Sequence, residues 1–245
     1  MAIYVLFDTE TTGNQDNDRI IQVGAMIVHS KDHIDVIDEL CSSDEPIKIE
    51  AMEVHNITPD IIANKPPYPQ TTFANLIEKY NHKDNYLIAH NISFDLSMLQ
   101  KEGFENQYTL IDTLRCAKHL LPDSPAHRLQ YLRYALDLYK IEADEAKRVG
   151  IEIKAHDAIG DVLVMKLLLS HLVKLTQQNY PNVNPMQKLA ELTKTPVLMK
   201  EFKFGKYKNQ NIEEIASSDI GYLRWMRDTL DLDEDMKYTL DYYLG

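Results

Sequence analysis

Residues 4–13, YVLFDTETTG, run from an apolar stretch directly into two acidic residues, Asp8 and Glu10. The β-branched and aromatic residues up to Phe7 predict a buried β-strand. Successive side chains of a strand point to opposite faces, so Asp8 and Glu10 project to one side if the extended backbone continues past Phe7. Two carboxylates on one side suit a hard cation such as Mg²⁺, although Asp, Thr and Gly also form ordinary solvated turns. The stretch therefore indicates either a metal site or a plain loop at the strand exit.

The pattern around this strand predicts an α/β fold. Two further strands are expected at residues 19–29 and 33–41, close enough in sequence for an antiparallel meander. After them helices and strands alternate, which is typical of a layered α/β domain. The expected elements are helices at residues 70–80, 93–102, 128–138 and 157–178 and strands at residues 86–90 and 109–114. We therefore expect a mixed β-sheet that starts with three antiparallel strands and carries helices on its faces.

The stretch QNYPNVNP, residues 178–185, breaks the last of these helices with two prolines and three asparagines. It separates the main part of the chain from a shorter C-terminal part. We predict three units in the order domain, linker and small module, over residues 1–177, 178–197 and 198–245.

The C-terminal part has two charged segments. Residues 194–208 carry five lysines interleaved with three aromatic residues. Such a segment can follow a nucleic-acid backbone while its rings stack on bases, but a module this small also needs aromatics for its core. Both interpretations stay open. The acidic run at residues 228–235 is expected to be a solvated helix flank.

Size, charge and cysteine content narrow the class of function. The 245 residues are 44% hydrophobic, enough for a real core, and no stretch approaches the roughly 18 apolar residues of a membrane span. The N-terminus lacks the basic start of a signal peptide, so we expect a cytoplasmic protein. Cys41 and Cys116 are expected to be buried small hydrophobes. The formal net charge of −12 argues against a protein that coats nucleic acid with Lys and Arg, so any nucleic acid must meet a local basic patch or divalent cations.

Two later stretches bring further acids. YLIAHNISFDLSML places Asp95 in the first turn of a helix, where an acid also simply favours the positive end of the helix dipole. KAHDAIGDVLVM places Asp161 on the long helix. His156 can share a site with Asp161 only from the loop before this helix, because on a continuous helix the two side chains would point about 140° apart. A lone histidine near a helix start is more often structural or solvent-facing. Taken together, Asp8, Glu10, Asp95 and Asp161 suit a two-metal site for phosphodiester hydrolysis, with His156 as general base.

The order of the motifs resembles that of the DnaQ-like 3′–5′ exonucleases. FDTETTG, AHNISFD and HDAIGD are similar to the three motifs of the DEDDh subgroup, whose third motif is His-x4-Asp. The resemblance implies a ribonuclease H-like fold and two Mg²⁺ or Mn²⁺ ions. It also implies direct metal ligation by Asp8, Glu10 and Asp161, ligation by Asp95 directly or through water, and His156 as the base.

Substrate contacts are expected around the same motifs. Asn91 follows the strand predicted at residues 86–90, where open α/β sheets deliver ligand-contacting side chains. Asn14 and Gln15 lie on a loop that we expect to overhang the site and to meet the terminal base or base pair. AMEVHNIT, residues 51–58, is similar to the family's helix near the substrate terminus. We therefore predict that the substrate-binding residues are Thr11, Thr12, Asn14, Gln15, His55 and Asn91.

Residues 204–226, FGKYKNQNIEEIASSDIGYLRWM, resemble the C-terminal segment of exodeoxyribonuclease X-type enzymes, and LTKTPVLMKEF just before them fits too. This resemblance implies hydrolysis of the 3′-terminal phosphodiester of single- or double-stranded DNA to 5′-mononucleotides, in DNA repair. The alternatives are an RNA 3′-trimming exonuclease and a polymerase-associated proofreading or non-catalytic end-binding subunit. A homodimer and a repair or polymerase partner stay open, and no membrane partner is expected.

Overall fold

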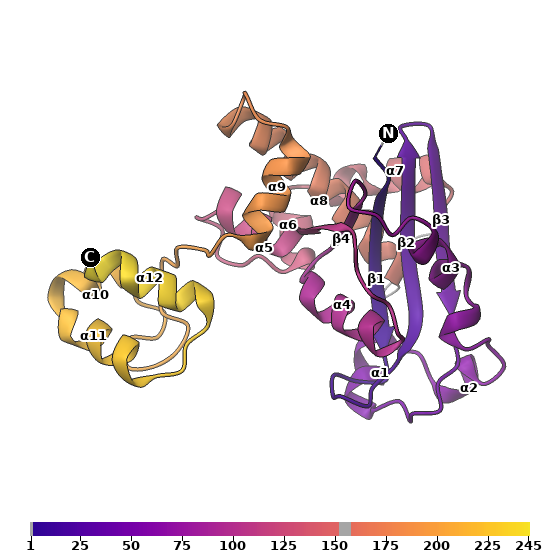
Figure 1. Cartoon of the computed structure of the whole chain (residues 1–245), viewed down its shortest axis with the longest axis horizontal. Helices are drawn as coiled ribbons and strands as arrows, with labels where there is room; N and C mark the ends of the chain where they lie inside the picture. Colours follow the sequence, from indigo (N-terminus) through magenta and orange to yellow (C-terminus); the bar gives the residue numbers. More distant parts are fainter. Residues whose placement is uncertain (1, 152–157) are drawn as a thin grey trace.

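The structure, a computed structural model, describes residues 2–151 and 158–245. These residues form a five-stranded sheet in the order β3-β2-β1-β4-β5 (Figure 1). The strands are β1 (Tyr4–Thr11), β2 (Ile20–Ser30), β3 (His33–Leu40), β4 (Tyr86–Ala89) and β5 (Thr109–Asp112). β1, β2 and β3 pair antiparallel, β4 is parallel to β1, and β5 is parallel to β4. The predicted mixed sheet with three antiparallel strands at its start is confirmed.

Helices cover both faces of this sheet. The helix α8 packs on β1 and β2, and with α5, α6 and α9 it buries Leu6 and Met26. The opposite face, which carries Phe7 and Ile27, is covered by α3 and α4. Even-numbered residues of β1 therefore face α8, as strand alternation requires. The helices of this part are α1 (Ile49–His55), α2 (Pro59–Ile62), the 3₁₀ turn η1 (Tyr68–Gln70), α3 (Thr72–Lys79), α4 (Ile92–Lys101), α5 (Thr113–Leu120), α6 (Leu129–Ala135), α7 (Tyr139–Val149), α8 (Ala158–Asn179) and α9 (Pro185–Lys194).

The alternation of helices and strands is confirmed, but the sequence did not predict α2, α5, α7 or α9. Asp112 ends β5 and at once caps α5, because its side chain accepts hydrogen bonds from the backbone of Leu114 and Arg115. α6 ends earlier than predicted, at Ala135, and the left-handed backbone of Asp137 (φ 57°) separates it from α7. Hydrophobic periodicity alone does not show where β5 passes into α5 or where α6 ends and α7 begins.

The predicted helix break is confirmed, since α8 ends at Asn179 and α9 begins at Pro185. α9 belongs to the main part of the molecule, because its Leu189 and Leu192 are buried in the core that α5 and α8 form. The linker was predicted over residues 178–197. We propose that α9 belongs with the main domain and that the C-terminal module begins after it.

The C-terminal module consists of α10 (Ile212–Ser218), α11 (Ile220–Thr229) and α12 (Glu234–Leu244), shown in yellow in Figure 1. A loop around Gly205, closed by a bridge between Glu201 and Asn211, precedes them. Phe202 is fully buried and Tyr207 packs against it, whereas Phe204 is exposed. The core interpretation therefore holds for two of the three aromatics. The five lysines of residues 194–208 are exposed.

An ion pair joins the module to α5. Asp235 is buried, lies 2.9 Å and 3.3 Å from the guanidinium nitrogens of Arg115, and accepts a hydrogen bond from the backbone of Val197. The prediction that the acidic run at residues 228–235 is solvated is wrong at this position. Sequence proximity could not show that folding places an arginine of α5, 120 residues away, against this carboxylate.

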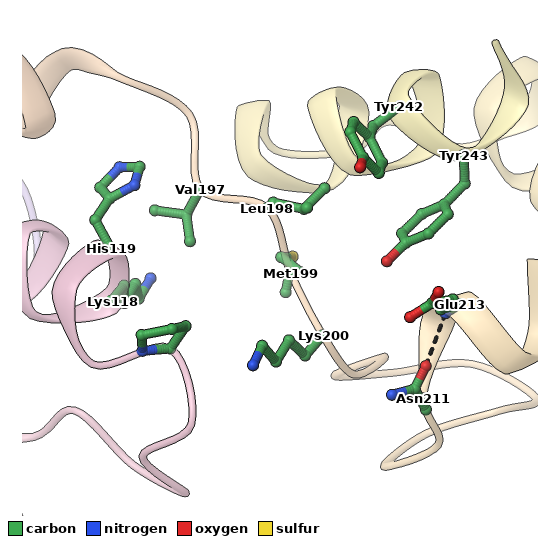
Figure 2. A pocket seen from close by; sticks show the side chains of 11 residues that line it. Lys118, His119, Val197, Leu198, Met199, Lys200, Asn211, Glu213, Tyr242 and Tyr243 are labelled. Atoms are coloured by element: carbon green, nitrogen blue, oxygen red, sulfur yellow. Dashed lines mark hydrogen bonds between the residues drawn. The ribbon is translucent and has the colours of Figure 1, made fainter.

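A cavity of about 460 Å³ lies beside this ion pair. Figure 2 shows Lys118 and His119 of α5 on one side of it and Tyr242 and Tyr243 of α12 on the other, with residues 197–200 running between them. The junction is thus lined by cationic and aromatic side chains from both parts.

Two general expectations about the chain are also tested. Cys41 and Cys116 are free and buried, as predicted, and burial raises the pKa of each thiol to about 12. Among the described residues, no helix has both the length and the apolar character needed to cross a bilayer.

Candidate active site

β1 carries both acids of the first motif, because the strand continues to Thr11 instead of ending near Phe7. Asp8 pairs with Gly24 of β2, and Glu10 follows on the same face of the strand, which is the face that α8 covers. β4 pairs with β1 only as far as Leu6. The second half of β1 therefore has an edge that β4 does not cover, beside its two carboxylates.

α4 brings Asp95 to this edge. The chain turns between β4 and α4 at Asn91, which adopts the left-handed conformation (φ 74°). Asp95 is buried one turn later, and its Oδ1 accepts hydrogen bonds from the backbone N–H and the hydroxyl of Thr9, at 3.1 Å and 2.7 Å. These bonds tie α4 to β1 and hold the carboxylate next to Asp8.

Asp161 comes from the first turn of α8, which lies directly on β2. A Cβ atom at Gly24 would lie 2.3 Å from the backbone nitrogen of Ile159 and 2.4 Å from the carbonyl carbon of Ala158. Only glycine permits this approach. Because Gly24 is the strand partner of Asp8, the same contact brings Asp161 to the first motif.

α6 braces Asp161 from outside the sheet. Gln130 Nε2 donates a hydrogen bond to Asp161 Oδ1 at 2.5 Å, and Arg133 Nη1 donates to Gln130 Oε1 at 3.3 Å. The guanidinium of Arg133 also forms a two-point ion pair, at 2.7 Å and 3.1 Å, with the buried Glu142 of α7. A continuous chain of polar contacts therefore runs from α7 through α6 to the candidate site.

Burial and neighbouring charges perturb the protonation of two of the four carboxylates. Burial, and then the charges of Asp95, Glu10 and Asp161, raise the pKa of Asp8 well above its usual range. Burial also raises the pKa of Asp95 to about 7, against the hydrogen bonds from Thr9, which lower it. The four acids that the sequence predicted to work together are thus brought together by β1, α4 and α8.

This donor set fits a divalent cation. Hard cations such as Mg²⁺ and Mn²⁺ prefer carboxylate oxygens, and a bound cation reverses the electrostatics that disfavour the charged form of Asp8. The predicted general base, His156, lies outside the described residues. Its role stays a prediction.

A cavity of about 670 Å³ opens beside Glu10. One wall is the loop after β1, with Asn14 and Gln15, both of which are exposed. Val54 of α1 and Phe94 of α4 add apolar surface, and Lys48 and Glu50 also line the cavity. The cavity combines apolar surface with a few polar groups, which is typical of ligand sites.

Three of the predicted substrate-binding residues are buried and hydrogen-bonded within the protein. The hydroxyl of Thr11 donates to the carbonyl of Gly13 at 2.7 Å, and that of Thr12, fully buried, donates to Asp18 at 2.9 Å. His55 is buried, and its Nδ1 accepts from the backbone of Ile57 while its Nε2 lies 3.2 Å from the Thr11 carbonyl oxygen. These side chains shape the loop and α1. Their contact with substrate stays a prediction.

Asn91 is exposed beside Asp95, and its side chain does not cap α4, so it presents its amide to solvent near the site. The preceding His90 has a structural environment instead. Its ring nitrogens lie 2.9 Å from the Thr113 hydroxyl and 2.9 Å from the His127 carbonyl oxygen. The contact of Asn91 with substrate stays a prediction.

Sequence reasoning missed four residues of this region, namely Gly24, Lys48, Phe94 as a cavity wall, and Gln130. Gly24 could have been found, because a glycine inside a strand often marks a close backbone approach. Lys48 lines the cavity and pairs with Asp18. Nothing in the sequence near Gln130 links it to Asp161, and only the fold does so.

The chain matches the exonuclease family model over residues 5–169 and the exodeoxyribonuclease X-like C-terminal model over residues 202–231. Exodeoxyribonuclease 10 of Escherichia coli (strain K12) is 28% identical over 244 residues, which cover 98% of this chain and 97% of that protein. DNA polymerase III subunit epsilon of Treponema pallidum (strain Nichols) is 28% identical over 196 residues, which cover 75% of this chain and 83% of that protein.

Two solved structures show the same fold. Exonuclease X in complex with 5′ overhanging duplex DNA has a TM-score of 0.56 at 22% identity, over 79% of this chain and 99% of that chain. Exonuclease I of E. coli in complex with a dT13 oligonucleotide has a TM-score of 0.53 at 21% identity, over 73% of this chain and 42% of that chain. The expected ribonuclease H-like sheet is confirmed. Because the exonuclease model spans the sheet and all four acids, the chain belongs to the exonuclease family.

Proposed function

We propose that this protein is a 3′–5′ exodeoxyribonuclease that hydrolyses the 3′-terminal phosphodiester of DNA and releases 5′-mononucleotides. The observation that carries the proposal is that four carboxylates from β1, α4 and α8 lie together. The charges of three of them raise the pKa of the fourth, Asp8. The chain belongs to the exonuclease family and is similar, over nearly its whole length, to an exodeoxyribonuclease. Both findings support DNA as the substrate. A role in DNA repair and a cytoplasmic location are part of this proposal.

The proposed cofactors are two Mg²⁺ or Mn²⁺ ions, held by Asp8, Glu10, Asp95 and Asp161. Bound there, such ions would neutralise the terminal phosphate and lower the pKa of the attacking water. The protein's contribution is to fix the carboxylates before substrate arrives. Thr9 holds Asp95 with two hydrogen bonds, and Gln130 holds Asp161 with one. We propose His156 as the base that accepts the proton of the attacking water.

The cavity beside Glu10 would receive the 3′-terminal nucleotide. Its apolar surface, Val54 and Phe94, offers contact to the face of a base, and its polar loop offers the amides of Asn14 and Gln15. We infer that this loop meets the terminal base or base pair. Replacing both amide residues by alanine should lower activity on duplex ends more than on single strands, and unaltered activity on duplex ends would remove this role.

The C-terminal module would extend the DNA-binding surface. Lys203, Lys206 and Lys208 are exposed beside the exposed Phe204. Lysines beside an aromatic ring can contact phosphates while the ring stacks on a base. Because the protein has a net charge of −12, binding of DNA at a distance from the metal site would need a local basic patch of this kind.

The direct test is degradation of 3′- and 5′-labelled DNA and RNA oligonucleotides, single-stranded and duplex, in Mg²⁺. Wild type should shorten DNA from its 3′ end, whereas Asp8→Asn and His156→Ala should be slower by about 10²-fold or more. Asp60→Asn is the matched control, because Asp60 is an exposed carboxylate on α2, outside the site. A preference for RNA would replace the proposed substrate. No cleavage with retained binding of DNA ends would show that the chain is a binding subunit.

A second candidate is action as the proofreading subunit of a DNA polymerase, a role that the similarity to DNA polymerase III subunit epsilon favours. The two candidates differ in what the purified chain does alone. Full exonuclease activity without a polymerase supports autonomous action, whereas activity that rises only on addition of a polymerase supports the second candidate.

A further inference from the structure

Two imidazole rings and a carboxylate meet at the β2–β3 hairpin, away from the four acids. His29 precedes the turn on β2, and His33 and Asp35 follow it on β3. The strand register shifts between Val28 and Ser30, so His29 is the extra residue of a β-bulge. Bulges re-aim a side chain. Here the ring of His29 stacks on that of His33, with centroids 4.4 Å apart and planes 19° from parallel.

Asp35 faces both rings. Its Oδ2 lies 2.9 Å from His29 Nε2, and its Oδ1 lies 3.6 Å from His33 Nε2. Each of the three residues offers one ligand atom within 4.8 Å of the other two. In a tetrahedral Zn²⁺ site with bonds of about 2.0–2.1 Å, neighbouring ligand atoms lie about 3.3 Å apart. The two distances, each to a different oxygen of Asp35, lie on either side of this value, so rotation of the side chains must bring one of these oxygens and the two ring nitrogens around a single ion.

The ligand types and their exposure select the kind of ion. Imidazole nitrogens favour Zn²⁺ and similar transition metals, whereas Mg²⁺ prefers oxygen ligands. The side chain of His29 is 18% exposed, and Tyr80 packs edge-on against its ring. Those of His33 and Asp35 are 65% and 44% exposed. One ligand is thus held in place while the other two are open to an ion from solvent.

We propose that His29, His33 and Asp35 bind one Zn²⁺ ion, with water as the fourth ligand. The site is separate from the four acids, because Asp8 pairs with Gly24, five residues along β2 from His29, which is about 16 Å. β3 is the edge strand of the sheet. An ion that joins the first residues of β3 to β2 would hold the end of this edge hairpin together. The site would therefore be structural and independent of the proposed nuclease function.

The first test is a calorimetric titration of the full chain with Zn²⁺ in excess Mg²⁺. His33→Asn should bind one Zn²⁺ fewer than wild type or bind it more than about 100-fold more weakly, since loss of a ligand costs more than loss of a supporting residue. His82→Asn is the matched control. His82 also lies beside an aspartate, Asp84, at 3.5 Å, but among the described residues this pair belongs to no three-ligand cluster. The control should bind Zn²⁺ as wild type does.

The four acids can also take up Zn²⁺, so a second measurement assigns the ion. One equivalent of Zn²⁺ should shift the imidazole NMR resonances of His29 and His33, both in wild type and in Asp8→Asn, and leave those of His82 in place. Unchanged zinc stoichiometry and affinity in a folded His33→Asn would overturn the proposal. If that variant does not fold, unshifted His29 and His33 resonances in wild type at saturating Zn²⁺ would overturn it equally.

Discussion

Asp8 and Asp95 show how the site stores electrostatic repulsion for a cation. Both carboxyl groups have raised pKa values, chiefly because burial removes them from water, and neighbouring acids add to the effect on Asp8. This arrangement of carboxylates does not stabilise the folded protein itself. The repulsion is relieved when a divalent cation binds, so affinity for the metal comes from groups that are unfavourable without it.

The raised pKa of Asp95 predicts the pH dependence of stability in the metal-free protein. Its folded pKa of about 7 exceeds the unfolded value of about 3.9, so its stabilising contribution is fully present below pH 4 and is lost as pH rises through 7. In EDTA, Asp95→Asn should therefore stabilise the protein at pH 8, relative to wild type, by on the order of 1–4 kcal/mol, since the amide oxygen can still accept from Thr9. Thermal unfolding at pH 5 and pH 8 measures this difference.

Asp231→Asn is the control for that experiment, because Asp231 is fully exposed in the C-terminal module. Excess Mg²⁺ should raise the unfolding temperature of wild type at pH 8 more than that of Asp95→Asn. A variant that is no more stable than wild type in EDTA at pH 8 would contradict the burial that we assign to Asp95.

Gly24 is the residue on which the approach of α8 depends. In Gly24→Ala the new Cβ would meet the backbone of Ala158 and Ile159, which cannot rotate away. We expect a loss of stability of about 1–3 kcal/mol and a larger fall in nuclease activity, because α8 carries Asp161. Chemical unfolding and oligonucleotide degradation measure the two effects.

Gly221→Ala is the matched control, because the nearest atom to its new Cβ is a side-chain oxygen at 3.6 Å, an ordinary contact. Gly221 lies in α11, where alanine should be neutral or stabilising by up to about 1 kcal/mol. Equal behaviour of the two variants would show that the backbone contact at Gly24 relaxes easily.

At the scale of elements, the candidate site depends on helices that carry none of its four acids. α6 reaches Asp161 through Gln130, and Arg133 holds that helix to the buried Glu142 of α7. In Arg133→Ala the carboxylate of Glu142 stays buried without its cation. Because Arg133 is about a quarter exposed, we expect a loss of about 1–3 kcal/mol, less than for a fully buried pair.

The same variant should also slow DNA hydrolysis, since Gln130 loses its neighbour. Lys140→Ala is the control, because Lys140 pairs with Asp137 on an exposed surface of the same region, where such pairs contribute little. If both variants are as stable and active as wild type, the polar chain from α7 to Asp161 has no mechanical role.

The sequence predicted those elements whose pattern is local. Apolar runs indicated β1, β2, β3 and β4, and the long apolar face of α8 was evident. The strand alternation even predicted that Asp8 and Glu10 share a face, which requires only that β1 continue past Phe7. α5 was missed because it begins directly after the last residue of β5. α7 was missed because it is mostly exposed and rich in charged residues.

The contacts between elements could not be predicted. Gln130 and Asp161 lie 31 residues apart, and Arg115 and Asp235 lie 120 apart. Such pairs depend on loop lengths and packing angles that no periodic pattern encodes. The candidate site was therefore predictable in its acids, which a motif carries, but not in the residues that hold those acids in place.

At the scale of the whole molecule, the junction beside α5 sets how the C-terminal module is held against the main part (Figure 2). The ion pair between Arg115 and the buried Asp235 is its main contact, and Lys200 of the connecting segment pairs with Asp123 at its rim. If the module contacts DNA, this junction fixes the distance between its lysines and the four acids. A second DNA-binding surface strengthens binding only when the connection between the two surfaces lets one DNA molecule occupy both at once.

Asp235→Asn weakens this junction without touching the candidate site, and two substrates separate the consequences. Hydrolysis of the p-nitrophenyl ester of thymidine 5′-monophosphate, which is too small to reach the module, should stay within about twofold of wild type, because the four acids are unchanged. Degradation of a long DNA strand should fall by roughly tenfold at moderate salt, since the module is no longer held at a fixed distance. Asp228→Asn, an exposed carboxylate of the same module, is the control and should alter neither rate. An equal fall on both substrates would mean that the ion pair supports the catalytic fold, and no fall on either would mean that the module takes no part in holding DNA.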